Sequence, residues 1–162
     1  MPEVKEIVIN TGPIIAIVAA LGDLSVLQSL YNRVLVPFEV CREVGAGGTS
    51  GFAVEEFEKA DWLCRWPEQL HLSPYIRNSL DIGEASVIQL ALNEGIKTVC
   101  IDETVGRRVA RLSELSLTGS LGILLRAKRE GYSLDLVAAM GRMKDRGIWL
   151  SKNVEEFVLS HV

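Results

Sequence analysis

The sequence has few cysteines, and they are far apart. Cys41, Cys64 and Cys100 include no C-x-x-C pair, which fits structural thiols in a reducing cytoplasm. The longest apolar stretch, Pro13 to Leu21, is far too short to span a bilayer. No signal peptide precedes the acidic start of the chain. We therefore expect a cytoplasmic protein that makes no contact with a membrane.

Histidines and excess positive charge are also scarce. His71 lies in a stretch without a clear pattern and His161 lies at the terminus, so a Ser–His or Cys–His mechanism has little support. The net charge of -4 argues against non-specific binding to nucleic acid, although it leaves a local basic patch open. Neither a G-x-G-x-x-G motif nor a P-loop follows the first strand, which disfavours a small-molecule phosphate or nucleotide binder.

The chain does contain enough apolar residues for a real core. Hydrophobic residues make up 48% of its 162 residues, which predicts one domain over residues 1–162. Strands alternate with helices, and this order predicts a parallel sheet covered on both faces. The first predicted strand is the apolar run that precedes the polar turn in the stretch Glu6–Pro13. The others are Val34–Val36, Thr98–Ile101 and Leu115–Leu117, with a short one in Trp62–Trp66.

Helices are predicted between and after these strands. One begins at Pro13, where the missing N–H of proline costs nothing, and a second, capped by Asp23, runs to Tyr31. Gly45–Gly51 is predicted as a loop, and Pro67–Leu80 is poorly patterned. The remaining helices are one from Pro37, Glu55–Ala60, Gly83–Glu94, Glu103–Leu112, Gly119–Arg129, Leu134–Arg146 and one from Asn153.

Four polar residues are candidates for chemistry, and each has a simpler explanation: two, Asn10 and Asp102, lie at the expected carboxyl ends of strands, and two, Glu43 and Glu84, lie on expected helices. Asn10 alone is explained by an Asx turn, and Asp102 by a helix cap. Glu43 borders the apolar side of its helix and Glu39 points away from it, so Glu43 alone reads as a solvated flank. Glu84 is harder to dismiss, because residues 87, 88 and 91 place it at the head of a buried stripe, where a charge needs a partner.

Taken together, the four positions predict a metal site. The carboxyl ends of parallel strands share one edge of the sheet, where ligands bind in open α/β folds. Acids that converge there repel one another unless a cation joins them. Oxygen ligands without Cys or His favour Mg²⁺ or Mn²⁺ over zinc.

The ordered set of these motifs resembles the PIN domain, and within it a prokaryotic branch related to VapC toxins. The resemblance covers about residues 7 to 158. It is carried by Val8-Ile-Asn-Thr-Gly-Pro13, Val36-Pro37 to Arg42-Glu43, Leu80-Asp-Ile-Gly-Glu-Ala85, Ile101-Asp102-Glu103 to Gly106-Arg107, and Leu117-Thr-Gly-Ser-Leu-Gly122.

The resemblance implies a Rossmann-like three-layer α/β/α sandwich and a metal-dependent ribonuclease. Its four acid positions fall on Asn10, Glu43, Glu84 and Asp102, which would hold Mg²⁺ or Mn²⁺; the three acids are the expected catalytic residues. It also implies a toxin of a toxin–antitoxin pair, with a cognate antitoxin and a homodimeric assembly as partners.

Asn10 departs from the family pattern, which has Asp at this position. The branch often carries an amide here, whose oxygen still ligates a metal ion. One charge is lost, and at ~4 Å and an effective dielectric of ~20 a unit-charge pair is worth about 4 kcal/mol before desolvation. We therefore expect weaker metal binding.

The alternative function is a catalytically weakened or inactive module that binds nucleic acid or protein. The Pro13–Leu21 helix and the pair Trp62 and Trp66 would then form the partner surface. Core packing explains the helix better.

Substrate contacts are expected from residues next to the acids. Thr11 is placed to bind a metal water or a phosphate. Arg107 and Arg108, extended by Arg111, lie one turn into the helix after Asp102 and face either RNA phosphates or solvent. Thr118 and Ser120 open another helix at the same edge. The N–H groups at that helix start either bind phosphate or serve only in a helix cap.

Overall fold

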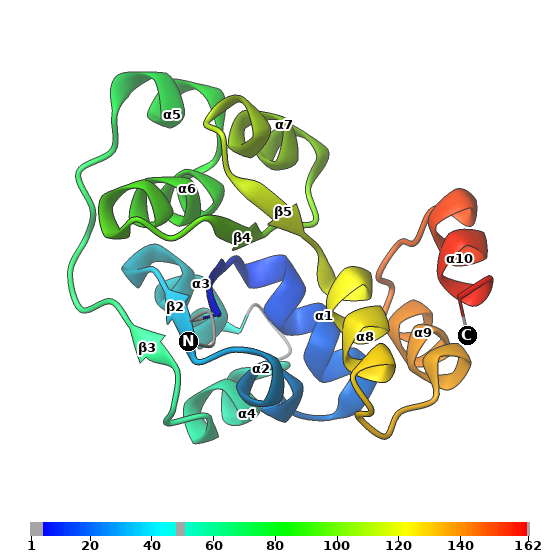
Figure 1. Ribbon diagram of the computed structural model, residues 1–162. Coiled ribbons are helices and arrows are strands. Elements are labelled where there is room, and N and C mark those ends of the chain that lie inside the picture. Colours follow the sequence, from blue (N-terminus) through cyan, green and yellow to red (C-terminus); the bar gives the residue numbers. More distant parts are fainter. Residues whose placement is uncertain (1–4, 48–50, 162) are drawn as a thin grey trace.

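The computed structural model of the chain describes residues 5–47 and 51–161. Five parallel strands form one sheet in the order β3-β2-β1-β4-β5, and ten helices flank it within the described residues (Figure 1). The strands are β1 (Glu6–Ile9), β2 (Arg33–Val36), β3 (Cys64–Arg65), β4 (Thr98–Cys100) and β5 (Ser116–Thr118). The predicted three-layer α/β/α sandwich with a parallel sheet is confirmed.

The helices follow the predicted order with one addition. They are α1 (Thr11–Leu21), α2 (Ser25–Leu30), α3 (Phe38–Ala46), α4 (Val54–Lys59), α5 (Pro74–Ser79), α6 (Ile82–Glu94), α7 (Thr104–Leu112), α8 (Ser120–Arg129), α9 (Leu136–Asp145) and α10 (Lys152–Leu159). Helix α5 lies in the stretch that had no clear pattern. Its six residues bury only Ile76, so they carry almost no periodic signal.

Two helix starts differ from prediction. Helix α1 begins at Thr11 and not at Pro13; proline is tolerated as its third residue because the N–H groups of a first turn lack intrahelical partners in any case. Asp23 does not cap α2 directly, since the cap position is Leu24. Its carboxylate instead accepts bonds from the Ser25 N–H and hydroxyl, 3.0 and 2.8 Å away.

The Gly45–Gly51 region is shorter as a loop than predicted. Gly45 and Ala46 still belong to α3, which ends at Gly47 with φ of 63°. Residues 48–50 of that predicted loop lie outside the described part of the chain.

Helix α1 is the centre of the hydrophobic core. Ile14, Ile17 and Val18 join the cluster that contains the strands. Ala16, Ala19 and Ala20, on its other side, join a second cluster with α8 and α9. This helix therefore packs in the core and is not a free partner surface. Trp62 and Trp66 are likewise partly buried against the first cluster.

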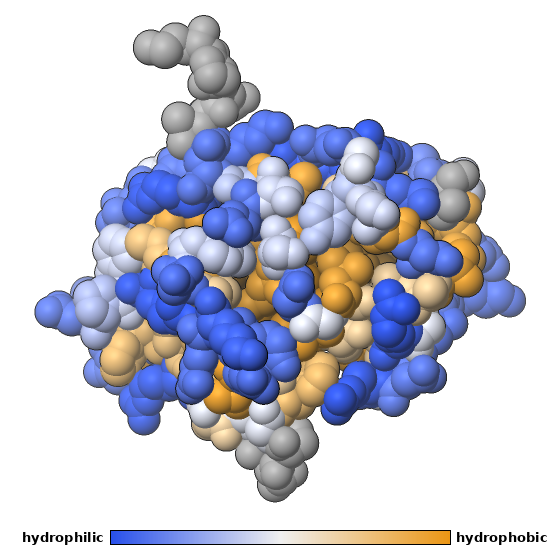
Figure 2. Space-filling model, turned by 90° about the horizontal axis from the view of Figure 1, so that it is seen from below, coloured by the Kyte–Doolittle hydropathy of each residue, from blue (hydrophilic) through white to orange (hydrophobic). Residues whose placement is uncertain are grey.

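The strand pairings set the geometry of the sheet edge. Strand β1 is central and pairs with β2 and β4, and α6 packs on β1 and β4. In the view from below Figure 1, apolar residues are visible in the middle of the face and hydrophilic residues surround them (Figure 2). None of the described helices is long and apolar enough to cross a membrane.

Candidate functional site

The ends of β1, β4 and β5 are tied together by backbone hydrogen bonds. The Asn10 N–H donates to the Cys100 carbonyl over 3.1 Å, and the Ile101 N–H donates to the Thr118 carbonyl over 3.1 Å. Asn10, Asp102 and Gly119, which follow these strands, are therefore neighbours at one edge of the sheet. Asn10 is only 6% exposed, and its side-chain Oδ1 is buried without a hydrogen-bond partner.

Helix α3 brings Glu43 to the same edge. The Thr11 hydroxyl, in the first turn of α1, donates to Glu43 Oε2 over 2.8 Å. The carboxylate also lies against Gly83 of α6, and a Cβ on that glycine would be 3.1 Å from Glu43 Cδ. Glu43 therefore bridges the first turns of two helices, and Thr11 contacts an acid side chain directly.

The expected orientation of α3 is wrong for its other acid. Glu39 was predicted to point away from the apolar side, but it is only 6% exposed. Its Oε1 accepts the Leu70 N–H over 3.2 Å. The segment that covers Glu39 is 31 residues further along the chain, so the pattern of α3 alone contains no sign of it.

Glu84 is the most buried acid of the site, and its position at the head of the apolar stripe of α6 is as predicted. It is 6% exposed, while Val87, Ile88 and Ala91 are fully buried. Burial, followed by repulsion from Asp81, Glu103 and Glu43, raises the pKa of Glu84 to about 7.

Asp81 and Glu103 stand at two helix starts beside Glu84. Asp81 caps α6 by accepting the Glu84 N–H over 2.9 Å, and Glu103 occupies the cap position of α7. The repulsion that these acids exert shows that Glu84 lies within an acidic group and not in an isolated apolar pocket.

Asp102 caps a helix, but not the one that follows it. Its Oδ1 accepts the Ser120 N–H over 2.8 Å and its Oδ2 accepts the Ser120 hydroxyl over 2.9 Å, so it joins the start of α8. The expectation that Asp102 would cap α7 is wrong, because Glu103 holds that position.

The predicted substrate contacts have different surroundings. Arg107 Nη1 donates to the Ile101 carbonyl over 2.8 Å and more weakly to the Thr118 carbonyl over 3.4 Å, so this arginine supports the ends of β4 and β5. Arg108 and Arg111 are exposed. The Thr118 hydroxyl makes a long 3.4 Å bond to the Gly119 carbonyl.

The acids are neighbours without forming a ready-made cage. In the part of the chain that the structure describes, no group of three or more His, Cys, Asp or Glu side chains is arranged to hold a metal ion. Glu43 and Glu84 interact electrostatically. Glu84 also lies against α7, where a Cβ on Gly106 would be 3.3 Å from Glu84 Cδ, and Asp102 directly precedes Glu103, the cap residue of that helix.

Two features of this edge were not predicted from the sequence. Glu103 contributes to the acidic group, and its only sequence signal is that it directly follows Asp102. Each of the three acids also lies against a glycine: Glu43 against Gly83, Glu84 against Gly106 and Asp102 against Gly119. Nothing in the sequence indicates which glycine contacts which acid.

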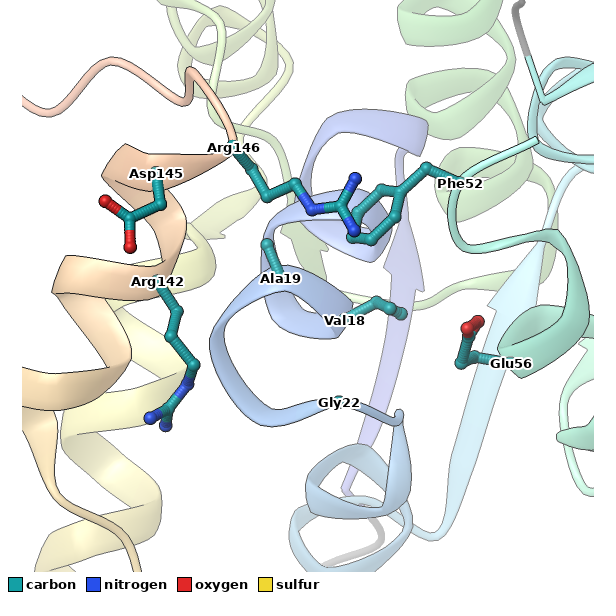
Figure 3. Close-up of a pocket in the computed structure, with 8 residues that line it drawn as sticks. All are labelled: Val18, Ala19, Gly22, Phe52, Glu56, Arg142, Asp145 and Arg146. Atoms are coloured by element: carbon teal, nitrogen blue, oxygen red, sulfur yellow. The ribbon is translucent and has the colours of Figure 1, made fainter. Parts of the chain in front are cut away.

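A separate pocket of about 370 Å³ lies at the other end of α1, beside Val18, Ala19 and Gly22. Figure 3 shows α9 on one side of it and Glu56 on the other, with the Arg146 guanidinium over the ring of Phe52, 3.8 Å from its centroid. None of the predicted site residues lines this pocket. Its charges are of mixed sign, so it does not resemble the acidic edge.

Comparison with known proteins gives one finding about family. Residues 6–162 match the model of a protein family described as a PIN domain. No curated protein matches the sequence.

Proposed function

Because the chain belongs to the PIN-domain family, we propose that it is a divalent-metal-dependent ribonuclease whose site is the acidic edge of the sheet. The observation that carries the proposal is the burial of two polar side chains, Glu84 and Asn10. Both side chains are 6% exposed, and Asn10 Oδ1 has no hydrogen-bond partner. A buried carboxylate and a buried, unpaired carbonyl oxygen at one edge are costly unless a cation binds them.

The side chains present fit a hard divalent cation. Glu43, Glu84 and Asp102 would hold it together with the Asn10 oxygen, and this all-oxygen set suits Mg²⁺ or Mn²⁺. Glu43 is exposed and has a flexible side chain, so it is the acid that adjusts most easily on binding. When bound, the ion supplies a water of lowered pKa and neutralises charge on the phosphodiester.

The other residues of the edge would orient the acids and the substrate. Thr11 holds Glu43 through its hydroxyl, and Ser120 holds Asp102 through its N–H and hydroxyl. Arg108 and Arg111 are exposed on α7, where they would bind RNA phosphates. With a net charge of -4, such local contacts would guide RNA more than the overall charge does.

We place the chain in the VapC-related branch of the family on the motifs around Asn10, Glu84 and Thr118. On this proposal it acts as a homodimeric toxin that a cognate antitoxin neutralises. Size-exclusion chromatography with light scattering would test the dimer, and a monomer at all concentrations would contradict it.

One observation favours a second function. The amide of Asn10 removes a charge from the edge, and a site weakened in this way would leave a PIN-type module that binds nucleic acid or protein without cleaving. The two functions differ in whether RNA is hydrolysed when metal is added.

RNA cleavage tests the proposal. Purified protein is mixed with RNA and Mn²⁺, and wild type is compared with Glu84→Gln, Asp102→Asn and a control, Glu58→Gln, that changes an exposed acid of α4. We expect the cleavage rate of both site variants to fall more than about 100-fold, which exceeds the usual loss when a residue that only supports a metal ligand is removed. The control should cleave like wild type. RNA binding without cleavage by wild type would favour the module. Equal cleavage by all four proteins would identify a contaminant or a different site.

A further inference from the structure

Three glycines of the sheet edge share a position at the start of a helix. Gly83 is the second residue of α6, Gly106 is the third residue of α7, and Gly119 is the cap residue of α8. None of the three has a positive φ. Their lack of a side chain is therefore not required by the backbone conformation.

At each of these glycines, an acid side chain occupies or borders the space where a Cβ would lie. A Cβ on Gly83 would collide with Glu43 Oε1 and lie 3.1 Å from its Cδ. A Cβ on Gly119 would lie 2.7 Å from Asp102 Oδ1. The contacts with Oε1 and Oδ1 are shorter than real Cβ contacts, so a neighbouring atom must move.

The contact of Gly106 with Glu84 is similar but looser. A Cβ there would lie 3.3 Å from Glu84 Cδ and 2.9 Å from Ile101 Cγ2. The added methyl would therefore press on the buried Ile101 first and on the carboxyl group second. Two helical glycines of the same region lack such neighbours, since nothing lies within 4 Å of a Cβ built on Gly12 or Gly45; a Cβ on Gly122 of α8 would meet Thr118 Oγ1 at 2.9 Å, which is not an acid.

The three contacts follow one pattern. Glu43 of α3 lies against the first turn of α6, Glu84 of α6 lies against the first turn of α7, and Asp102 lies against the start of α8. We call these three contact positions the seats of the acids. The start of a helix carries partial positive charge and free N–H groups, which stabilise a carboxylate. Each seat therefore sets the position of an acid, and at the start of α8 the Ser120 N–H also donates to the seated Asp102 carboxylate.

We propose that Gly83, Gly106 and Gly119 are positioning residues that set the metal affinity of the site. The inference rests on the proposed function, because it assigns these glycines a role toward the same divalent ion. A methyl group at Gly83 or Gly119 displaces an acid from its seat, and one at Gly106 presses on the Glu84 carboxyl group after Ile101. Glu43 moves readily because its side chain is long and exposed. Asp102 is short and can move only by giving up its bonds to Ser120.

The test compares glycine-to-alanine variants of the full chain. Mn²⁺ dissociation constants are measured by electron paramagnetic resonance for wild type, Gly83→Ala, Gly106→Ala, Gly119→Ala and two controls. Gly12→Ala adds a methyl to a first turn, and Gly45→Ala adds one to the helix of Glu43, both in open space. Metal-free melting temperatures show whether each variant is folded.

We expect Mn²⁺ affinity to fall roughly 10–100-fold in Gly106→Ala and Gly119→Ala, to fall least in Gly83→Ala because the Glu43 side chain adjusts readily, and to stay unchanged in both controls. In Gly119→Ala without metal, the Ser120 amide should also exchange its hydrogen faster, because its bond to Asp102 is displaced. Wild-type affinity in all three folded seat variants, or unchanged exchange at Ser120, would overturn the inference while leaving the proposed function intact. Failure of wild type itself to bind Mn²⁺ would instead overturn the proposed function and, with it, the positioning role.

Discussion

At the scale of single residues, Glu84 is the acid of the site on which burial and like-charge repulsion act most strongly. Its carboxyl group is buried, and Asp81, Glu103 and Glu43 all act on it with the same sign of charge. A cation bound at this edge would relieve the repulsion. Without the cation, protonation of Glu84 removes the repulsion, and its pKa is accordingly raised to about 7.

The first prediction concerns the stability of the metal-free protein against pH. The pKa of Glu84 rises from 4.5 to about 7 on folding, so between these values the folded state holds a proton that the unfolded chain has released. Ionised Glu84 therefore destabilises the fold as pH rises through this window. Relative to Glu84→Gln, wild type should lose roughly 6–12 °C in melting temperature between pH 4.5 and pH 8, because each pKa unit is worth about 1.4 kcal/mol and each kcal/mol about 2–4 °C in a chain of this length.

Differential scanning calorimetry in the presence of a chelator would measure this gap. Glu58→Gln is the control, because Glu58 is exposed on α4, and its gap to wild type should stay constant with pH. A constant gap for Glu84→Gln as well would mean that Glu84 is ionised in the folded protein at the same pH as in the unfolded chain.

Residue spacing predicted some of these surroundings and not others. The positions 84, 87, 88 and 91 lie on one side of a helix, so the burial of Glu84 follows from sequence alone. The burial of Glu39 does not, because Leu70 covers it from 31 residues away. The partner of Asp102 was missed for the same reason, since Ser120 is 18 residues distant.

At the scale of elements, the site is assembled from the starts of helices. Helices α1, α6, α7 and α8 all begin at the edge that carries the acids, and each contributes a first-turn or cap residue to an acid: Thr11, Gly83, Gly106, and Gly119 with Ser120. For α1, α7 and α8 this follows from a parallel sheet, because each starts where a strand has ended; α6 follows helix α5 and reaches the edge by packing on α3.

The second prediction in this section concerns the start of α8. The Ser120 hydroxyl is buried and donates to Asp102 Oδ2 over 2.9 Å. Ser120→Ala removes that bond and should lower the free energy of unfolding by about 1 kcal/mol. Urea denaturation measures the change. Ser29→Ala is the control, because Ser29 is exposed and its bond is long at 3.4 Å; equal midpoints for the two variants would contradict the role of Ser120.

Most elements could be predicted from periodicity, and the misses have local causes. The strands and long helices carry apolar residues at strand or helix spacing, which fixes their type more firmly than their ends. Helix α5 has one buried residue, Ile76, and so too little pattern to identify. The start of α1 was placed two residues late because Pro13 was taken as its first residue, whereas proline is also tolerated later in a first turn.

At the scale of the whole molecule, the sheet order explains how distant acids meet. Asn10 and Asp102 are far apart in sequence, but β1 and β4 are neighbours in the sheet. The alternation of strands and helices predicted a shared edge, and it could not predict the distances between side chains there. Those depend on how α3 and α6 pack on each other, which no single segment encodes.

The most direct test of the account is Mn²⁺ binding by titration calorimetry at pH 8. The central claim is that Asn10, Glu43, Glu84 and Asp102 share a divalent ion. We expect wild type to bind Mn²⁺, Glu84→Gln and Asp102→Asn to lose binding, and Asn10→Asp to bind about tenfold more tightly or better, because it restores a charge at the edge. Absence of binding by wild type, or unchanged binding by both Glu84→Gln and Asp102→Asn, would contradict the claim.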